Sequence, residues 1–302
     1  MATTEGEIHF HIPETNKPCK TWYKIVGDLS IKECPLVTLH GGPGMACEYL
    51  TPLQDLNARY GTTVIFYDQI GCGRSTHLPE KHGDHSFWTA ELFMKELNNL
   101  LQALKINTYD LYGQSWGGML ASLIASRRPK GLRKLIISNS PAKMSDWARS
   151  CAEWRAELPK DVNDTLSKHE QAGTITDPEY EAATNVFYER HVCRALPWAS
   201  EINRTFDWLK EDPTVYHTMN GPTEFHVIGP LKDWDTTEAC KLIEAETLLI
   251  SAQYDEGKEF VSLPFFKNIA KCKWVTLAES SHLSMWEERD RYNEIIGEFL
   301  RG

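Results

Sequence analysis

Residues 108–118 constrain this chain more than any other stretch, because they predict a short strand, a sharp turn and a helix that runs on from Met119. Gly113 and Gly117 flank Ser115 in a Gly-x-Ser-x-Gly pattern. A turn of this kind strains the backbone of its central residue, so the neighbouring residues must be small. It exposes the serine hydroxyl at the end of the strand, with helix amides behind it that can stabilise an oxyanion. The pattern alone is common, and its position between a strand and a helix makes it informative.

Short apolar runs alternate with helical patterns in both the first and the last part of the chain. Such runs are typical of strands buried in a parallel sheet. They occupy residues 35–39, 62–67, 108–112, 132–138, 247–251 and 272–277. Helices are predicted over 87–104 and 290–300, and antiparallel edge strands over 7–30. The sequence therefore predicts an α/β fold, with a mostly parallel central sheet and helices on both faces.

The pattern changes after Pro141. Residues 141–234 contain no buried-strand run, have helical spacing and are rich in tryptophan. We therefore expect a mainly helical cap, inserted into a core that residues 1–140 and 235–302 form. An insert at this point would lie over the carboxyl ends of the strands, where ligands bind in open parallel sheets. We expect its tryptophans to form chiefly its own hydrophobic core.

Two late loops offer the partners that a nucleophilic serine requires. The serine hydroxyl is inert until a base removes its proton, and the base needs a group that orients it. Asp255 follows the predicted strand 247–251, and His282 follows the strand 272–277. The resulting order Ser, Asp, His is the one expected for this type of sheet. Other acids near these positions compete with Asp255 for the orienting role: Glu256, and more weakly Asp233 and Asp235.

The amide of Trp116 and a glycine-rich loop are the candidates for an oxyanion hole. Trp116 directly follows the nucleophile, and its amide is the first donor expected. The second is expected from the loop 40–44 (His-Gly-Gly-Pro-Gly), from the Gly42 amide. A turn with a purely structural purpose is the alternative interpretation of this loop. His40 is a conceivable base, but its place at the end of a buried strand favours a structural hydrogen bond.

Composition narrows the range of partners. The 302 residues carry a net charge of −10, which argues against nucleic acid. No run approaches the roughly 18 apolar residues of a membrane helix, and no signal peptide is visible. The eight cysteines are scattered without metal-ligand spacing, as expected for reduced thiols in a cytoplasmic protein. No metal or organic cofactor is expected, and the oligomeric state stays open.

Over nearly its whole length the chain resembles the proline iminopeptidase family of serine peptidases, which have the α/β-hydrolase fold. The matching segments are His-Gly-Gly-Pro-Gly at 40–44, Asp-Gln-x-Gly-x-Gly-Arg-Ser at 68–75 and Gly-Gln-Ser-Trp-Gly-Gly at 113–118. Ile70 departs from the pattern, because many members carry arginine there. Residues 219–225 and 231–235 make the insert most similar to that of the tricorn-interacting aminopeptidase branch.

The resemblance implies a serine hydrolase that cleaves an amide bond next to a free N-terminal amino acid through an acyl-enzyme. A small peptide or aminoacyl amide would be the substrate, and Glu224 and Glu256 would bind its free amine. An ammonium group in a partly dry pocket needs such a carboxylate partner. Two alternatives stay open: a small-molecule amidase or esterase with the same machinery, and a ligand-binding protein without turnover. Ser115 argues against epoxide hydrolases and dehalogenases, which use aspartate at this position.

Overall fold

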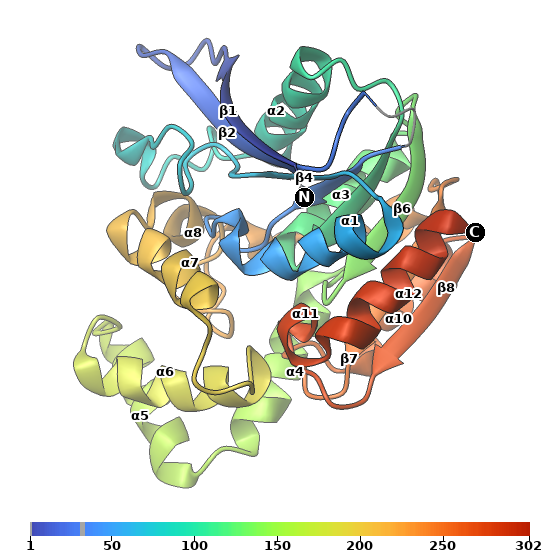
Figure 1. The fold of residues 1–302 in the computed structure, drawn as a ribbon. Coiled ribbons are helices and arrows are strands. Elements are labelled where there is room, and N and C mark those ends of the chain that lie inside the picture. Colours follow the sequence, from blue (N-terminus) through green and yellow to red (C-terminus); the bar gives the residue numbers. More distant parts are fainter. Residues whose placement is uncertain (1, 31–33) are drawn as a thin grey trace.

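A computed structural model describes residues 2–30 and 34–302. Its centre is an eight-stranded sheet with the order β1-β2-β4-β3-β5-β6-β7-β8 (Figure 1). The strands are β1 (Thr3–Phe10), β2 (Cys19–Val26), β3 (Leu36–Leu39), β4 (Val64–Tyr67), β5 (Tyr109–Gln114), β6 (Leu132–Ser138), β7 (Glu246–Ala252) and β8 (Cys272–Leu277). β1, β2 and β4 pair antiparallel, and the other neighbours pair parallel. The predicted mostly parallel sheet with an antiparallel edge is confirmed.

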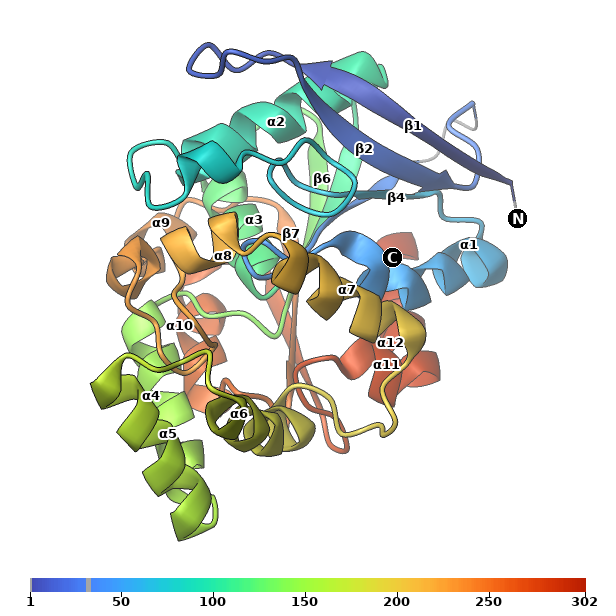
Figure 2. The same ribbon diagram turned by 90° about the vertical axis from the view of Figure 1, so that its left-hand side faces the viewer.

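Helices cover both faces of the sheet, which explains why every side chain of β3, β4 and β5 is buried. Figure 2 shows the two helical layers on opposite sides of the strands. One layer contains α1 (Asp55–Tyr60) and α12 (Arg289–Arg301), and the other contains α2 (Ala90–Ala103), α3 (Trp116–Ser126), α9 (Thr237–Cys240) and α10 (Glu259–Asn268). The helix α3 begins three residues earlier than predicted, because the Ser115 carbonyl already accepts hydrogen bonds from the Gly118 and Met119 amides.

Between β6 and β7 lie residues 141–234, which we call the cap segment; it consists of helices and loops. It contains α4 (Met144–Ala156), α5 (Lys160–Ala172), α6 (Pro178–His191), α7 (Ser200–Glu211), α8 (Thr214–Met219) and the 3₁₀ helix η3 (Pro230–Asp233). The short helices η1 (Cys47–Gln54), η2 (Pro79–Lys81) and α11 (Ser284–Glu287) complete the described chain. Among these described helices, none is both long and apolar enough to cross a membrane.

The tryptophans of the cap segment mostly lie at its boundary with the sheet, which differs from the prediction. The Trp147 ring packs edge-on against His282, with 5.4 Å between ring centroids. The Trp154 indole donates a hydrogen bond to the Asp255 carbonyl at 2.8 Å. Trp198 follows the expectation, since it stacks on Phe206 of α7 within the cap segment, and Trp154 also stacks on His191 of α6. An indole combines a large apolar face with a hydrogen-bond donor, so it suits a boundary where loop carbonyls need partners.

Candidate active site

Ser115 occupies a strained turn between β5 and α3. Its backbone has φ 55° and ψ −124°, a conformation that L-residues rarely adopt. Close backbone contacts exclude any side chain larger than hydrogen at the two flanking glycine positions. A Cβ atom on Gly117 would lie 2.1 Å from the Leu39 carbonyl oxygen, and one on Gly113 would lie 2.1 Å from the Gly117 carbonyl oxygen. The Gly-x-Ser-x-Gly pattern therefore reflects close packing of this turn against β3 and the first turn of α3.

The two late loops bring an aspartate and a histidine together behind this turn. His282 Nδ1 lies 2.7 Å from Asp255 Oδ1, and both side chains are buried. The other Asp255 oxygen accepts a hydrogen bond from the Asn139 amide group at 3.0 Å. Glu256, the strongest competitor, lies farther from the same ring nitrogen, at 3.8 Å. Asp235 pairs with Lys143 at the base of the cap segment instead. Asp255 is therefore the carboxylate that orients the ring.

A hydrogen bond links the segments that carry Ser115 and His282, although the two side chains are not hydrogen-bonded to each other. Gln114, directly before the serine, donates from its side chain to the His282 carbonyl at 3.2 Å. Among the described residues, Ser115 Oγ has no hydrogen-bond partner. With Nδ1 donating to Asp255, His282 keeps Nε2 free to accept a proton. Catalytic hydrogen bonds are often long in a substrate-free site and shorten when substrate binds.

Opposing influences set the protonation of His282. Burial lowers its pKa, but the charge and hydrogen bond of Asp255 and the charge of Glu224 outweigh burial, so that the net pKa is raised. Opposite charges nearby stabilise the imidazolium form. A histidine in this environment holds its proton at a higher pH than an ordinary histidine does.

The two amides predicted for the oxyanion hole are unoccupied donors. In the part of the chain described, neither the Gly42 nor the Trp116 amide donates to an acceptor. The neighbouring Gly41 amide donates to the Tyr49 hydroxyl at 2.6 Å. That hydroxyl in turn donates to the Gln114 side chain at 2.6 Å, which ties the glycine loop to the nucleophile turn. Gly42 has φ +109°, a left-handed conformation that favours glycine.

His40 has the structural role that its position favoured. Its Nε2 accepts a hydrogen bond from the Gln69 amide at 2.9 Å, and its Nδ1 lies 3.0 Å from the Gly41 carbonyl. Burial lowers the pKa of His40, which favours the neutral ring that these two bonds require. The Gln69 side chain also bridges the His40 carbonyl and the Trp116 indole. His40 therefore fixes the loop that carries Gly42.

Glu224 and Glu256 both lie near His282: Glu224 lines a pocket together with His282, and Glu256 Oε2 lies 3.8 Å from His282 Nδ1. Glu224, in the cap segment, accepts a hydrogen bond from the Tyr216 hydroxyl at 2.6 Å. Glu256 has no solvent exposure, and within the described residues neither of its carboxylate oxygens has a hydrogen-bond partner. Burial, followed by repulsion from Glu224 and Asp255, raises the pKa of Glu256 well above its ordinary range. Burial also raises the pKa of Glu224. Both carboxyl groups are therefore shifted toward their neutral forms in the substrate-free site.

The cap segment holds the loop that carries Asp255 and Glu256. The Ser150 hydroxyl of α4 donates to the Glu256 carbonyl at 2.5 Å and accepts from the Lys258 amide at 2.7 Å. The His191 ring on α6 bonds the Tyr254 carbonyl, and the His191 carbonyl accepts from the His282 amide. The geometry of the acid and histidine loops therefore depends on the cap segment as well as on the sheet.

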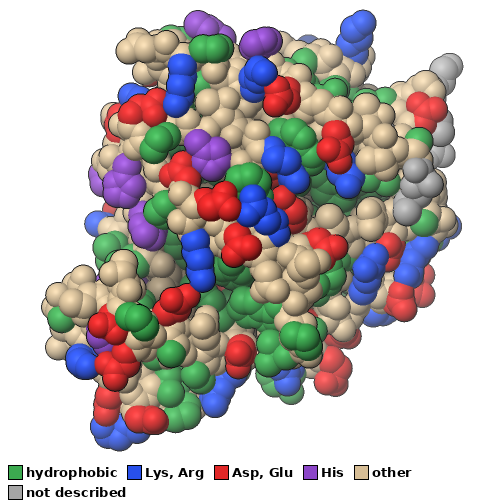
Figure 3. Space-filling view, turned by 60° about the vertical axis from the view of Figure 1, so that its left-hand side comes forward, with side chains coloured by type: hydrophobic (Ala, Val, Ile, Leu, Met, Phe, Trp, Pro, Cys, Tyr) green, Lys and Arg blue, Asp and Glu red, His purple; other side chains and the backbone are tan. Residues whose placement is uncertain are grey.

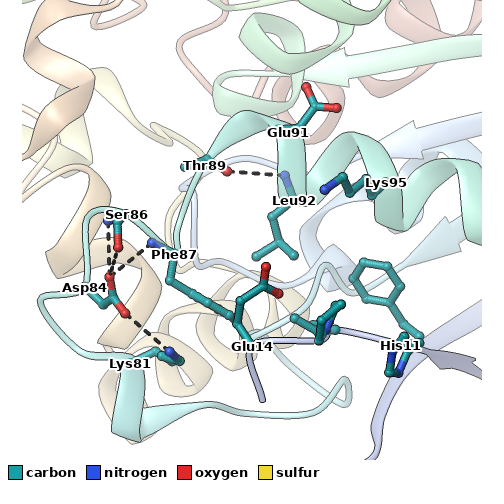
Figure 4. Close-up of a pocket in the computed structure, with 13 residues that line it drawn as sticks. His11, Glu14, Lys81, Asp84, Ser86, Phe87, Thr89, Glu91, Leu92 and Lys95 are labelled. Carbon is teal, nitrogen blue, oxygen red and sulfur yellow. Dashed lines mark hydrogen bonds and ion pairs between the residues drawn. The ribbon is translucent and has the colours of Figure 1, made fainter.

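A small, largely apolar pocket lies between these elements, with a volume of about 30 Å³, room for one or two waters. It is lined by Gly41, Gly42, Met45, Tyr49, Gln114, Val192, Ile202, Thr205, Phe206, Glu224, His282 and Leu283. A larger groove of about 220 Å³ lies elsewhere, beside α2 (Figure 4). Its polar groups bond one another, as Asp84 does with Ser86 and Lys81. None of the predicted site residues lines that groove, so we place the chemistry in the smaller pocket.

Two other clusters of metal-ligating residue types already contain cationic side chains. In the first, formed by Cys47, Glu48 and Asp68, Arg74 lies 2.9 Å from Glu48 and 3.0 Å from Asp68. In the second, on the cap segment, Lys168 lies 2.8 Å from Glu179. These arginine and lysine side chains supply the positive charge that a metal would otherwise bring.

Sequence reasoning missed three residues that organise the site: Asn139, Tyr216 and Gln114. Asn139 directly follows β6, so it lies at the same sheet edge as Ser115. This position in the sequence could have indicated a role in the site. Tyr216, on α8, precedes Glu224 by eight residues, and no periodicity in the sequence indicates that the two are in contact.

Comparison with known proteins identifies the fold and the family of this chain. The family model of the α/β hydrolase fold matches residues 35–288. The proline iminopeptidase of Saccharolobus solfataricus is 39% identical, over 88% of this chain and 84% of that protein. That of Thermoplasma volcanium is 36% identical over 89% of each chain.

Two crystal structures superpose closely on the whole chain. VinJ has a TM-score of 0.93 and 43% identity, and the proline iminopeptidase of Mycobacterium smegmatis has a TM-score of 0.87 and 38% identity. Both comparisons cover 98% of each chain. The sequence identity, the coverage and the shared fold lead to one assignment: the chain belongs to the proline iminopeptidase family of the α/β-hydrolase fold.

Proposed function

We propose that this protein is a serine aminopeptidase that removes an N-terminal residue from a small peptide or an aminoacyl amide. Ser115 Oγ attacks the scissile carbonyl while His282 Nε2 takes its proton, and Asp255 holds the ring. The amides of Gly42 and Trp116 stabilise the oxyanion, each worth roughly 3 kcal/mol. The C–N bond then breaks, the leaving amine receives the proton from His282, and water hydrolyses the acyl-enzyme.

The observation that carries the free-amine requirement is the Glu256 carboxyl group, which is buried 3.8 Å from His282 and has no hydrogen-bond partner among the described residues. Burial of a carboxylate without a hydrogen-bond partner costs folding free energy, and a bound ligand can supply the missing interaction. The ammonium group of an N-terminal residue would bind between Glu224 and Glu256, one residue away from the bond that is cleaved. Such binding would support cleavage after the first residue and would disfavour substrates with a blocked amine.

The names of the relatives favour proline as the N-terminal residue, because the similar enzymes are proline iminopeptidases. The apolar lining of the pocket, which includes Met45, Val192 and Ile202, suits a small apolar side chain. We further propose that residues 141–234 act as a cap domain on a core of residues 1–140 and 235–302.

We also propose a cytoplasmic location and no nucleic-acid partner. All eight cysteines are unpaired among the described residues, as expected in a reducing compartment. On the face shown in Figure 3, acidic and basic side chains are interspersed, which suits a small substrate better than a polyanion.

A substrate panel tests this proposal. Prolyl and alanyl naphthylamides are compared with their N-acetyl counterparts and with p-nitrophenyl esters. We expect high kcat/KM only for the amides with a free amine. Preference for N-acetyl amides would contradict the aminopeptidase assignment, and activity on esters alone would favour a small-molecule esterase. Absence of both turnover and Ser115 labelling by a fluorophosphonate would favour a ligand-binding protein.

A further inference from the structure

The Tyr49 hydroxyl lies where the glycine loop 40–44 meets the turn of the nucleophile. It accepts a hydrogen bond from the Gly41 amide at 2.6 Å and donates one to Gln114 Oε1 at 2.6 Å. The side chain is buried, and it lines the small pocket together with Gly42 and His282. The proposed reaction uses no atom of Tyr49, yet the contacts of its hydroxyl join two loops that the reaction needs.

The groups at the two ends fix the direction of these hydrogen bonds. An amide nitrogen can only donate, so the Tyr49 oxygen accepts from Gly41 and gives its single proton to Gln114. The Gln114 side chain must therefore present its oxygen to Tyr49. Its NH2 group is left to donate to the His282 carbonyl at 3.2 Å. One ordered chain of three hydrogen bonds thus joins the glycine loop, the nucleophile turn and the histidine loop.

Gly41 is the residue through which this chain reaches the oxyanion hole. A Cβ atom on Gly41 would lie 3.0 Å from the Tyr49 hydroxyl oxygen, 3.0 Å from Gln114 Oε1 and 3.1 Å from Ser115 Cβ. Gly41 is thus packed directly against the nucleophile turn. The next amide along the chain is that of Gly42, which donates to no acceptor among the described residues. The hydrogen bond from Tyr49 to Gly41 therefore restrains the backbone that aims this amide.

The backbone of Tyr49 is itself anchored beside the histidine loop. The Tyr49 carbonyl accepts a hydrogen bond from the Trp286 indole at 2.7 Å, and Trp286 belongs to α11, which begins two residues after His282. Burial raises the pKa of the Tyr49 hydroxyl, and its proton is already given to Gln114. The hydroxyl is therefore suited to holding its neighbours in place and unsuited to transferring a proton at neutral pH.

We propose that Tyr49 is a positioning residue that fixes the Gly42 amide of the oxyanion hole relative to Ser115, through its hydrogen bonds to Gly41 and Gln114. This inference rests on the proposed function, since it needs an oxyanion to form at that amide. A displaced donor stabilises the charge of the transition state less, while binding of the uncharged carbonyl changes little. Tyr49 therefore affects the chemical step more than it affects substrate binding.

Tyr49→Phe removes the hydroxyl and keeps the ring. We expect kcat for alanyl naphthylamide to fall about 30-fold with KM nearly unchanged, because the substitution displaces an oxyanion donor without removing it. The acid limb of kcat/KM against pH should stay in place, since the hydrogen bond between His282 and Asp255 is untouched. Tyr180→Phe removes another buried hydroxyl, one that donates to Glu170. It is the matched control and should behave like the wild type.

A pair of inhibitors separates the oxyanion hole from general damage to the site. The boronic acid analogue of alanine forms a tetrahedral adduct with Ser115 and places an oxygen in the oxyanion hole, whereas alaninol forms no adduct. Tyr49→Phe should raise the inhibition constant of the boronic acid about 30-fold, in parallel with the loss of kcat/KM, and leave that of alaninol unchanged. Equal weakening of both inhibitors, or no change in either, would overturn the positioning role.

Gln114→Met interrupts the same chain one link farther along and keeps the test decisive if Tyr49→Phe folds poorly. It should also weaken the boronic acid selectively. The double variant should lose little more activity than the more affected single variant, because both substitutions break one chain. Fully multiplicative losses would contradict the shared chain.

Failure of the inference is distinguishable from failure of the proposed function. A wild-type protein that turns over alanyl naphthylamide while Tyr49→Phe and Gln114→Met match it in kcat would overturn the positioning role alone. A wild-type protein with neither turnover nor inhibition by the boronic acid would overturn the proposed function, and the positioning role with it.

Discussion

Two neighbouring carboxyl groups on one loop of the active site differ in their partners: Asp255 is fully hydrogen-bonded, whereas Glu256 is not. Asp255 uses one oxygen for His282 and the other for Asn139. Glu256, one residue farther along, has no partner for either oxygen in the described chain. Under the proposed function, this difference would separate reactivity from selectivity: Asp255 would serve attack on any acyl carbonyl, while Glu256 would require the positive charge of a free amine.

A second buried glutamate shows that burial alone does not leave a carboxyl group without hydrogen-bond partners. Glu96 of α2 is also fully buried, but it accepts hydrogen bonds from the Thr21 hydroxyl at 2.5 Å and from the Ile70 amide at 2.9 Å. Both of its oxygens are therefore used in holding the chain. Glu96 therefore has a structural role, whereas Glu256 has unused hydrogen-bonding capacity in the described chain, as the proposed amine site requires.

The largest expected effect comes from the core. Ser115→Ala should lower kcat by about six orders of magnitude, because no other group replaces the nucleophile. The fold should persist, since the side chain is small and its hydroxyl has no partner in the described chain. Ser122→Ala, on the same helix, is the control and should keep full activity. Measurable turnover by purified Ser115→Ala would contradict the assignment of the nucleophile.

On the cap side, Glu224→Gln should raise KM for alanyl naphthylamide about 100-fold, with a smaller effect on kcat, because a buried ammonium would lose one of its two counter-charges. Steady-state kinetics of the purified variant measure both constants. Glu96→Gln should leave them unchanged. Unaltered kinetics in Glu224→Gln would remove the amine-binding role from the cap segment.

Ser150→Ala tests whether the cap segment supports the core. The variant loses both hydrogen bonds to the loop of Glu256, and we expect kcat/KM for free-amine substrates to fall about tenfold. Ser200→Ala, at an exposed position of α7, is the matched control. If Ser150→Ala equals the wild type in this assay, the sheet alone determines the geometry of the loop.

The smallest effect concerns stability. Burial raises the pKa of Glu96 to about 8. Between pH 4.5 and 8 the unfolded chain releases this proton while the folded chain keeps it, so stability falls as pH rises. Glu96→Gln should therefore raise the melting temperature by about 2 °C or more at pH 8 and by less at pH 4.5. An equal change at both pH values in calorimetry would contradict a neutral Glu96.

The sequence was sufficient for the sheet and for the residues fixed by local patterns. The strand ends and the turn at Ser115 follow from apolar runs and glycine spacing, and the shared sheet edge brings Asp255 and His282 together. The contacts of Tyr216 and Trp147 depend on how the cap helices pack, which no local period encodes. Helix α10 was missed because Pro264 and a weak apolar stripe obscure it. The roles of the site residues stay predictions.

The central claim is that His282 activates Ser115, and fluorophosphonate labelling of the wild type and of His282→Gln at neutral pH tests it most directly. Peptide mapping should find a single adduct, on Ser115, and the substitution should slow labelling about 1000-fold. An adduct on another residue, or a labelling rate that His282→Gln leaves unchanged, would contradict the account.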